Sequence, residues 1–245
     1  IYTLSLHDAL PIYQPRHRRA AVYWMWHYWT TAQSREADVD DLMECYAHFG
    51  EAGDVEQSDD AAQGAANILN RIGRWDDEWK LANRQLQNTH LNKARQAAWR
   101  HRLGVLAQFR GDYDTAHNRY QRALTTFEEL DDRANMAITY HSLGFLAQAR
   151  GDYDTARTQY QRALTTFEEL GNRAGMAKTY GQLGVLAQVR GDYDTAHNRY
   201  QQALTTFEEL DDRVNMADTH YQLGTLAQVR GDYDTARTQY QRALT

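Results

Sequence analysis

The sequence predicts an all-α solenoid, a row of antiparallel helix pairs that share their apolar sides with their neighbours. First, the segment GDYDTA recurs every 40 residues, beginning at Gly111, Gly151, Gly191 and Gly231. Second, the apolar residues of each repeat follow helical spacing. Third, no proline occurs after Pro15, so nothing forces the helices to break. A fixed period of this size indicates stacked repeats with a long exposed surface, which favours binding over catalysis.

Each repeat contains two helical stripes. In the repeat 134–170, the first stripe has offsets of three, four and seven residues and comprises Met136, Ala137, Tyr140, Leu143, Gly144 and Ala147. The second comprises Tyr153, Ala156, Tyr160, Ala163, Leu164, Phe167 and Leu170. We therefore expect two antiparallel helices per repeat, called helix A and helix B, each of roughly 17 residues and about 25 Å in length.

The residues between the two stripes predict a tight turn. Gly151 supplies the left-handed conformation that closes helix A. Asp152 can cap helix B, and Asp154 places negative charge near the positive end of that helix. Gly144 and Ala156 are small where the two helices must approach each other closely.

The repeat is weaker upstream of residue 93. RIGRWDDEWKLANRQL aligns with FRGDYDTAHNRYQRAL, which places Gly73 on Gly111 and Trp75 on Tyr113, with residues 61–72 as the preceding helix A. Further helices are expected over the stripe Val39, Leu42, Tyr46 and Phe49 and over the aromatic-rich residues 20–31. The predicted organisation is a helical linker over 13–54, a diverged repeat over 55–92 and regular repeats over 93–245, the last one truncated.

Both ends of the sequence are abrupt. Residues 1–12, IYTLSLHDALPI, resemble the in-frame translation of a sequencing-library adapter. A signal peptide is the alternative, but the segment lacks a basic start and is interrupted by His7 and Asp8. We expect an artefact and leave residues 1–12 out of the fold prediction. Because Ala243-Leu244-Thr245 matches mid-helix residues 123–125, we also expect a fragment of a longer reading frame.

The composition excludes several classes of protein. A net charge of -6, from 33 acidic and 27 basic residues, argues against general nucleic-acid binding. Cys45 is the single cysteine and is expected to fill the core. No apolar run reaches the roughly 18 residues that a membrane helix needs. We expect a soluble, cytoplasmic, all-helical chain that binds neither nucleic acid nor membrane.

The signature positions of the unit resemble those of the tetratricopeptide repeat, in the 40-residue form typical of kinesin light chains. Leu143-Gly144 fits helix A, Gly151 and Tyr153 fit the turn, and the small–aromatic–small series is Ala156, Tyr160 and Ala163. The family's aromatic residue of early helix A is present as Tyr140 and Tyr180 but is replaced by Arg100 and His220 in the other repeats. The usual proline after helix B is absent. The resemblance covers residues 93–245 and implies a right-handed α-solenoid, the tetratricopeptide superhelix, whose concave groove is lined by helix A and holds peptides.

A looser resemblance concerns HRRAAVYWMW at 17–26 and GRWDDEW at 73–79. These segments are similar to the helical region between a nucleotide-binding module and a tetratricopeptide tail in signal-transducing NTPases, mainly bacterial. The resemblance implies a sensor end of a larger regulator. No phosphate-binding loop occurs in this sequence, so no catalytic residue is carried over.

Other motifs favour structural roles. DYDT at 112–115 begins like a calcium loop but lacks the required glycine and distant glutamate, so capping is favoured. Glu128-Glu129 are adjacent on a helix and point in different directions, which favours a solvated face. His101 and His141 lack a third metal ligand. We therefore expect no enzyme, no cofactor and no metal.

Helix B barely changes between repeats, whereas helix A varies away from the Leu143 and Ala147 stripe. Variation of a groove and drift after recent duplication both account for this. For a groove that binds a protein or peptide, the candidate residues are His101, Phe109, Ile138, His141, Phe145, Lys178, Tyr221 and Thr225. The alternatives are self-association through uncapped ends, which gives a structural solenoid, and the tail of an NTPase whose catalytic module is missing here.

Overall fold

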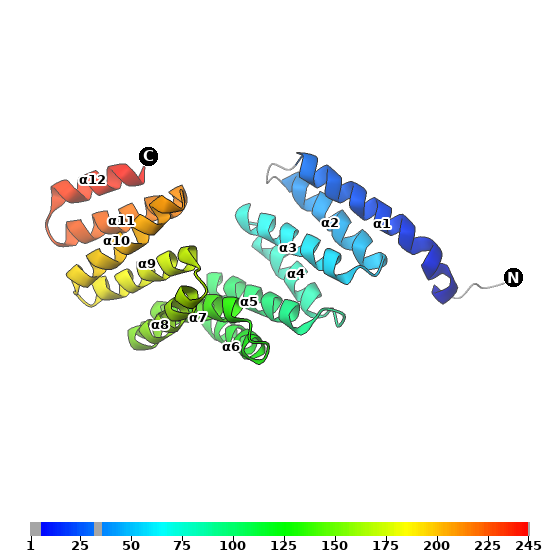
Figure 1. Cartoon of the computed structure of the whole chain (residues 1–245), viewed down its shortest axis with the longest axis horizontal. Coiled ribbons are helices and arrows are strands. Elements are labelled where there is room, and N and C mark those ends of the chain that lie inside the picture. Colours follow the sequence, from blue (N-terminus) through cyan, green and yellow to red (C-terminus); the bar gives the residue numbers. More distant parts are fainter. Residues whose placement is uncertain (1–5, 32–35, 245) are drawn as a thin grey trace. The chain divides into compact units, whose positions relative to one another are not determined.

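The computed structural model describes residues 6–31 and 36–244, and these residues form twelve helices and no strand. The chain divides into two compact units, Ile1–Arg110 and Gly111–Thr245 (Figure 1). Within each unit the helices contact their neighbours along the sequence, so the predicted all-α solenoid class is confirmed. No helix in the described segments combines the length and hydropathy needed to cross a bilayer.

The first unit contains α1 (Leu6–Thr31), α2 (Glu36–Glu51), α3 (Val55–Arg71), α4 (Trp75–Leu86) and α5 (Lys93–Phe109). Two details differ from the sequence analysis. Helix α1 begins at Leu6 and so includes residues 6–12 of the adapter-like segment, whereas residues 1–5 lie outside the described part. Pro11 and Pro15 lie inside α1 rather than before the helical region.

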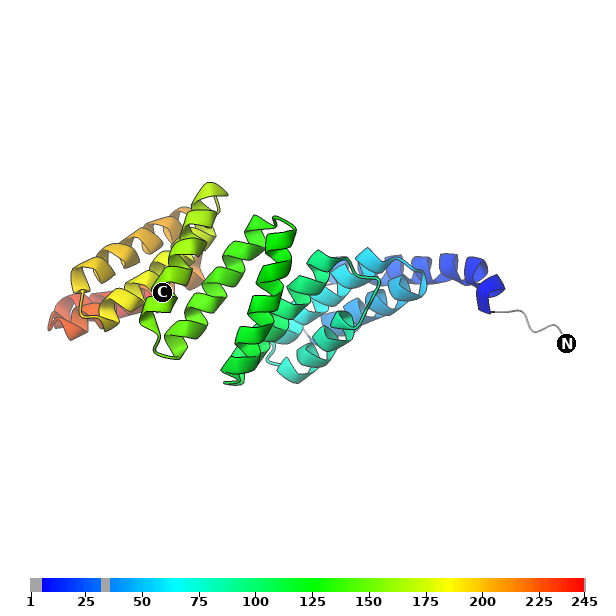
Figure 2. The same ribbon diagram turned by 90° about the horizontal axis from the view of Figure 1, so that it is seen from below.

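The second unit contains the regular repeats. Its helices are α6 (Tyr113–Glu129), α7 (Arg133–Ala149), α8 (Tyr153–Glu169), α9 (Arg173–Val189), α10 (Tyr193–Glu209), α11 (Arg213–Val229) and α12 (Tyr233–Ala243). Helices α6 to α11 have 17 residues each, as the stripes predict. Successive helices run back and forth in Figures 1 and 2, and α7, α9 and α11 are the A helices.

The turns of the second unit confirm the predicted local chemistry. Gly151 has φ of 78°, and the Asp152 carboxylate accepts a hydrogen bond from the Thr155 backbone N–H at 3.1 Å. Hydrogen bonds from the Thr155 side chain and backbone hold the pKa of Asp152 below its usual value. The turns from helix B to helix A also need a left-handed residue, which is Gly171 in one repeat and Asp131 or Asp211 in the others.

A glycine–tyrosine contact closes each A–B hairpin. A Cβ atom on Gly144 of α7 would lie 2.7 Å from the Tyr160 ring of α8, and the pairs Gly184–Tyr200 and Gly224–Tyr240 repeat this geometry. Tyr160 is fully buried, and its hydroxyl donates to Gln148 Oε1 at 3.1 Å. The same ring packs in a cluster with Leu186 of α9, so it joins one hairpin to the next.

We predict that Gly184→Ala destabilises the second unit by about 1–3 kcal/mol, because the new methyl group overpacks a buried ring that cannot move away. The Cβ would lie 2.7 Å from Tyr200 Cε1, and Tyr200 is 1% exposed. Urea unfolding followed by circular dichroism measures the change.

Gly181→Ala is the matched control on the same helix, because nothing lies within 4 Å of a Cβ there. Alanine is the better helix former by about 1 kcal/mol, so this variant should be as stable as the parent or more stable. Equal destabilisation by the two substitutions would contradict the close-approach explanation.

Candidate binding surface

The A helices form the inner face of the second unit. Helix α7 contacts α9, and α9 contacts α11, whereas α8 and α10 do not contact each other within residues 111–244. The stack is therefore tighter on the helix-A side. Two hollows lie along these helices. We call inner face the following eight of the A-helix positions that border them: Ile138, His141, Ser142, Lys178, Gly181, Gln182, Asp218 and Gln222.

The first hollow lies between α7 and α9 and has a volume of about 340 Å³. Ile138, His141 and Ser142 line it from α7, and Gly175 and Lys178 line it from α9. Phe167 at the end of α8 forms its apolar side. Gly175 stands where the neighbouring repeats have Asn135 and Asn215, and the Phe167 ring packs directly against it, since a Cβ there would lie 2.7 Å from Phe167 Cδ1.

The second hollow lies between α9 and α11 and has a volume of about 210 Å³. His141 and Lys178 border this hollow too, and Asp218 and Gln222 line it from α11. Gly181 stands where the other repeats have His141 and Tyr221, so the missing side chain at Gly181 leaves the second hollow open. The two hollows are thus neighbours that share His141 and Lys178.

His141 is half-buried between the hollows and uncharged at neutral pH. Burial, and to a lesser extent the Lys178 charge, lowers the pKa of His141 to about 4. Its ring lies 5.4 Å from the Tyr160 ring, centroid to centroid. Its Nε2 atom is buried without a hydrogen-bond partner among the described residues. A neutral imidazole can serve a ligand as donor or acceptor, whichever tautomer it adopts.

The structure brings together three of the eight predicted residues, Ile138, His141 and Lys178, at the first hollow. Phe145, Tyr221 and Thr225 lie on A helices of the same unit but line neither hollow. Tyr221 instead packs against the ring of Tyr240, 5.6 Å away.

His101 and Phe109 lie on α5, in the first unit. His101 borders a separate hollow of about 310 Å³ with Trp99 and Arg102, and burial lowers its pKa to about 4. Phe109 is 60% exposed at the end of α5 and stacks on Trp75, with ring centroids 6.0 Å apart.

Asp218 was absent from the predicted set, although the sequence contained a signal for it. It occupies the same repeat position as Ile138 and Lys178, two residues that were selected. Gln182 and Gln222 were also missed, and they occupy the position of Ser142. Carrying Ile138 and Lys178 through the repeats at the 40-residue offset would have found Asp218, whereas no candidate occupies the repeat position of Gln182 and Gln222.

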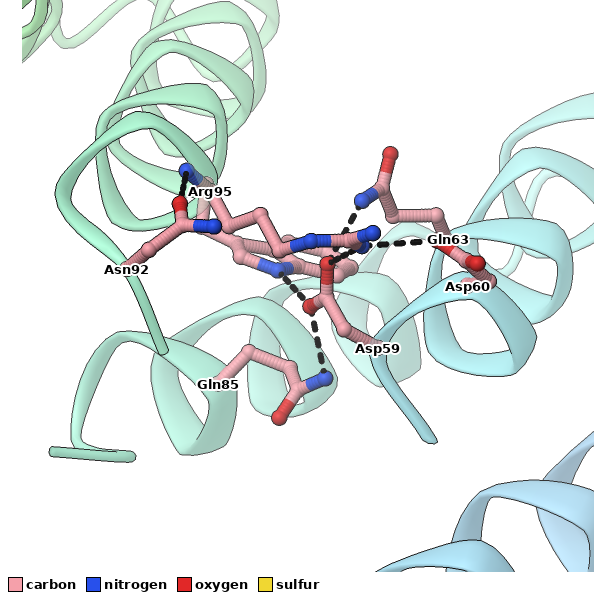
Figure 3. Close-up of polar contacts among 7 residues, drawn as sticks. Asp59, Asp60, Gln63, Gln85, Asn92 and Arg95 are labelled. Carbon is pink, nitrogen blue, oxygen red and sulfur yellow. Dashed lines mark hydrogen bonds and ion pairs between the residues drawn. The ribbon is translucent and has the colours of Figure 1, made fainter. Parts of the chain in front are cut away.

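The first unit contains a fully buried carboxylate, a feature that is also typical of catalytic sites. Asp59 is fully buried on α3, and Figure 3 shows Gln63, Gln85 and Arg95 directed toward it. Its two oxygens accept hydrogen bonds from Gln63 Nε2 at 2.7 Å, Gln85 Nε2 at 3.0 Å, Arg95 Nη1 at 2.6 Å and Trp99 Nε1 at 2.6 Å. These donors come from α3, α4 and α5, so one carboxylate joins three helices.

This arrangement suits a structural role. Four donors satisfy the carboxylate, which leaves no lone pair directed at a ligand. Among the described residues, no group of three histidine, cysteine or acidic side chains could hold a metal ion. Glu78 is held in the same way, by Arg102 Nε at 2.6 Å and Asn70 Nδ2 at 3.0 Å.

A comparison with protein-family models agrees with the helical-repeat fold. The family model described as Tetratricopeptide repeat matches residues 94–169, 135–209 and 175–245. No curated protein sequence matches the chain.

Solved structures with the same fold include BtubC (BKLC) from P. vanneervenii, with 20% identity, a TM-score of 0.58, and coverage of 96% of this chain and 89% of that one. Aspartyl phosphate phosphatase F from Bacillus subtilis has 11% identity, a TM-score of 0.71, and coverage of 97% and 71%. A Rap protein complexed with competence and sporulation factor has 14% identity, a TM-score of 0.67, and coverage of 99% and 76%. At these identities the likeness concerns the fold.

We predict that Asp59→Ala destabilises the first unit by about 3–5 kcal/mol, because it leaves the buried Gln85 and Trp99 donors without their acceptor and leaves Arg95 paired with Asp60 alone. Asp60→Ala is the control, since Asp60 also pairs with Arg95, at 2.7 Å, but is exposed. The control should cost less than about 1 kcal/mol. Thermal melting of both variants tests this, and similar losses would show that burial of the carboxylate is unimportant.

The lowered pKa of His141 predicts a pH dependence of stability. Below the unfolded pKa of about 6.5, the unfolded chain binds a proton that the folded chain binds only near pH 4, so stability falls as the pH falls between these values. From pH 7 to pH 5 the contribution is roughly 2 kcal/mol. His141→Gln cannot titrate and should reduce the pH dependence by that amount in urea unfolding. An unchanged slope would refute the assignment.

Proposed function

Because the chain belongs to the tetratricopeptide repeat family, we propose that its second unit binds a protein or peptide segment on the inner face. The observation that carries the proposal is the pair of adjacent hollows, bordered by exposed side chains that differ from repeat to repeat. The chain is a repeat scaffold, and its role in this proposal is recognition rather than catalysis. The sensor or interaction end of a larger signalling regulator is the setting we infer for it.

The distribution of variation supports this proposal. The buried residues of helix B, such as Ala156 and Tyr160, recur unchanged at Ala196 and Tyr200. The inner-face positions change in chemical kind instead, from Ile138 to Lys178 and then Asp218. Packing demands constrain the first group, whereas an exposed face is free to specialise for a partner.

The solved structures supply an analogy for the ligand. A Rap protein of the same fold is complexed with competence and sporulation factor. The likeness is one of fold at 14% identity, so it makes a bound partner plausible for this scaffold without identifying one.

We predict that peptides selected from a random library on the full chain bind through the inner face. His141→Ala with Lys178→Ala should weaken them at least about tenfold, as loss of groups at the centre of an interface does. Fluorescence anisotropy with the selected peptides measures the change. Phe145→Ala and Tyr221→Ala should have smaller effects, because neither residue lines a hollow.

Arg157→Ala with Gln161→Ala is the matched control, since both residues are exposed on α8, outside the inner face. It should leave affinity within twofold. Equal weakening by the two double variants, or no selected peptide at all, would defeat the proposal.

A further inference from the structure

Three equivalent inner-face positions differ in charge. Ile138 on α7, Lys178 on α9 and Asp218 on α11 are spaced 40 residues apart and occupy the same place in their repeats. All three are exposed, Ile138 by 43%. Ile138 and Lys178 border the first hollow, and Lys178 and Asp218 border the second. Along the inner face the order is therefore apolar, positive, negative.

Neither Lys178 nor Asp218 belongs to an ion pair within residues 111–244, although both border one hollow. Lys178 does add, after the Asn215 hydrogen bonds, to the lowering of the pKa of Asp212. Arginines elsewhere in this unit are paired between successive hairpins: Arg150 with Asp114 at 2.7 Å and Arg230 with Asp194 at 3.1 Å. Because His141 is uncharged at neutral pH, Lys178 supplies the positive charge between the hollows.

The spacing of the three positions suits an extended chain. Neighbouring packed helices lie about 8–10 Å apart. A polyproline II helix has three residues per turn and rises about 3.1 Å per residue, so every third side chain returns to the same side after about 9 Å. Residues i, i+3 and i+6 of such a peptide can therefore face α7, α9 and α11 in turn.

An α-helical ligand is the alternative shape. It would present residues i, i+7 and i+14 at a similar spacing, so about 15 residues would be needed to reach the three positions that about seven residues of an extended chain reach.

We propose that the inner face selects a peptide in the polyproline II conformation that carries an apolar, an acidic and a basic side chain at every third residue, placed opposite Ile138, Lys178 and Asp218. The central acidic residue pairs with Lys178 in either chain direction. This inference rests on the proposed function and specifies its ligand class.

The test uses the full chain and two labelled peptides of equal composition, with blocked termini. The matched peptide has the core Leu-Pro-Ser-Glu-Pro-Ser-Lys, and the exchanged peptide has Leu-Pro-Ser-Lys-Pro-Ser-Glu. Fluorescence anisotropy at low salt should show at least about tenfold tighter binding of the matched peptide. A third peptide, with the same guests seven residues apart in an alanine-rich helix, should bind no better than the exchanged one.

The double variant Lys178→Asp with Asp218→Lys exchanges the two protein charges. Both positions are exposed, and a melting temperature close to that of the parent confirms that the variant folds. In this variant the preference should reverse, so that the exchanged peptide binds about tenfold tighter. Reversal distinguishes recognition of the charge order from general attraction to either peptide.

Three results would overturn the inference: no preference between the two peptides, a preference that survives the charge exchange, or tighter binding of the helical peptide. The inference is also overturned if none of the three peptides binds. The proposed function is judged separately by the random-library selection. If the selected library peptides need His141 and Lys178 but the designed peptides fail, the proposed binding on the inner face stands and only the proposed ligand class is wrong.

Discussion

The second unit depends on one repeated steric constraint, the contact of a helix-A glycine with a helix-B tyrosine. A Cβ at Gly144, Gly184 or Gly224 would lie 2.7 Å from its tyrosine ring. In the first two pairs the ring is then buried against the next A helix, as Tyr160 is against Leu186 and Tyr200 is against Leu226. These two contacts thus set both the closure of a hairpin and its docking on the next, which keeps the A helices adjacent and brings their exposed sides into one surface.

The inner face is available for recognition because the stabilising contacts lie elsewhere. The buried tyrosines and the arginine pairs between hairpins hold the repeats together without an ion pair from Lys178 or Asp218. Ile138, Lys178 and Asp218 can consequently change without loss of packing. The second hollow stays open because Gly181 carries no side chain where other repeats have histidine or tyrosine, whereas at Gly175, beside the first hollow, the Phe167 ring fills the place of a side chain.

The sequence predicted those features whose causes are local and repeated. Helix length, the glycine turn at Gly151 and the Asp152 cap follow from residues a few positions apart, and the structure has all three. The buried Asp59 network was not foreseen, because its donors Gln85 and Trp99 lie 26 and 40 residues away. Phe145 and Tyr221 were selected as varied aromatic residues, but neither borders either of the two hollows. The position of a hollow depends on the side chains of adjacent helices, which the variation along one helix does not reveal.

The near identity of the B helices has a consequence for how the chain reaches this fold. Tyr160 and Tyr200 make the same contact with their glycines, so either B helix can occupy the site of the other. A chain that pairs one repeat out of step, or with a hairpin from a neighbouring molecule, would satisfy every buried contact equally well. The residues that differ between repeats, most of them on the A helices, are what distinguishes the correct pairing from these alternatives. The varied inner-face positions therefore also bear on correct pairing during synthesis.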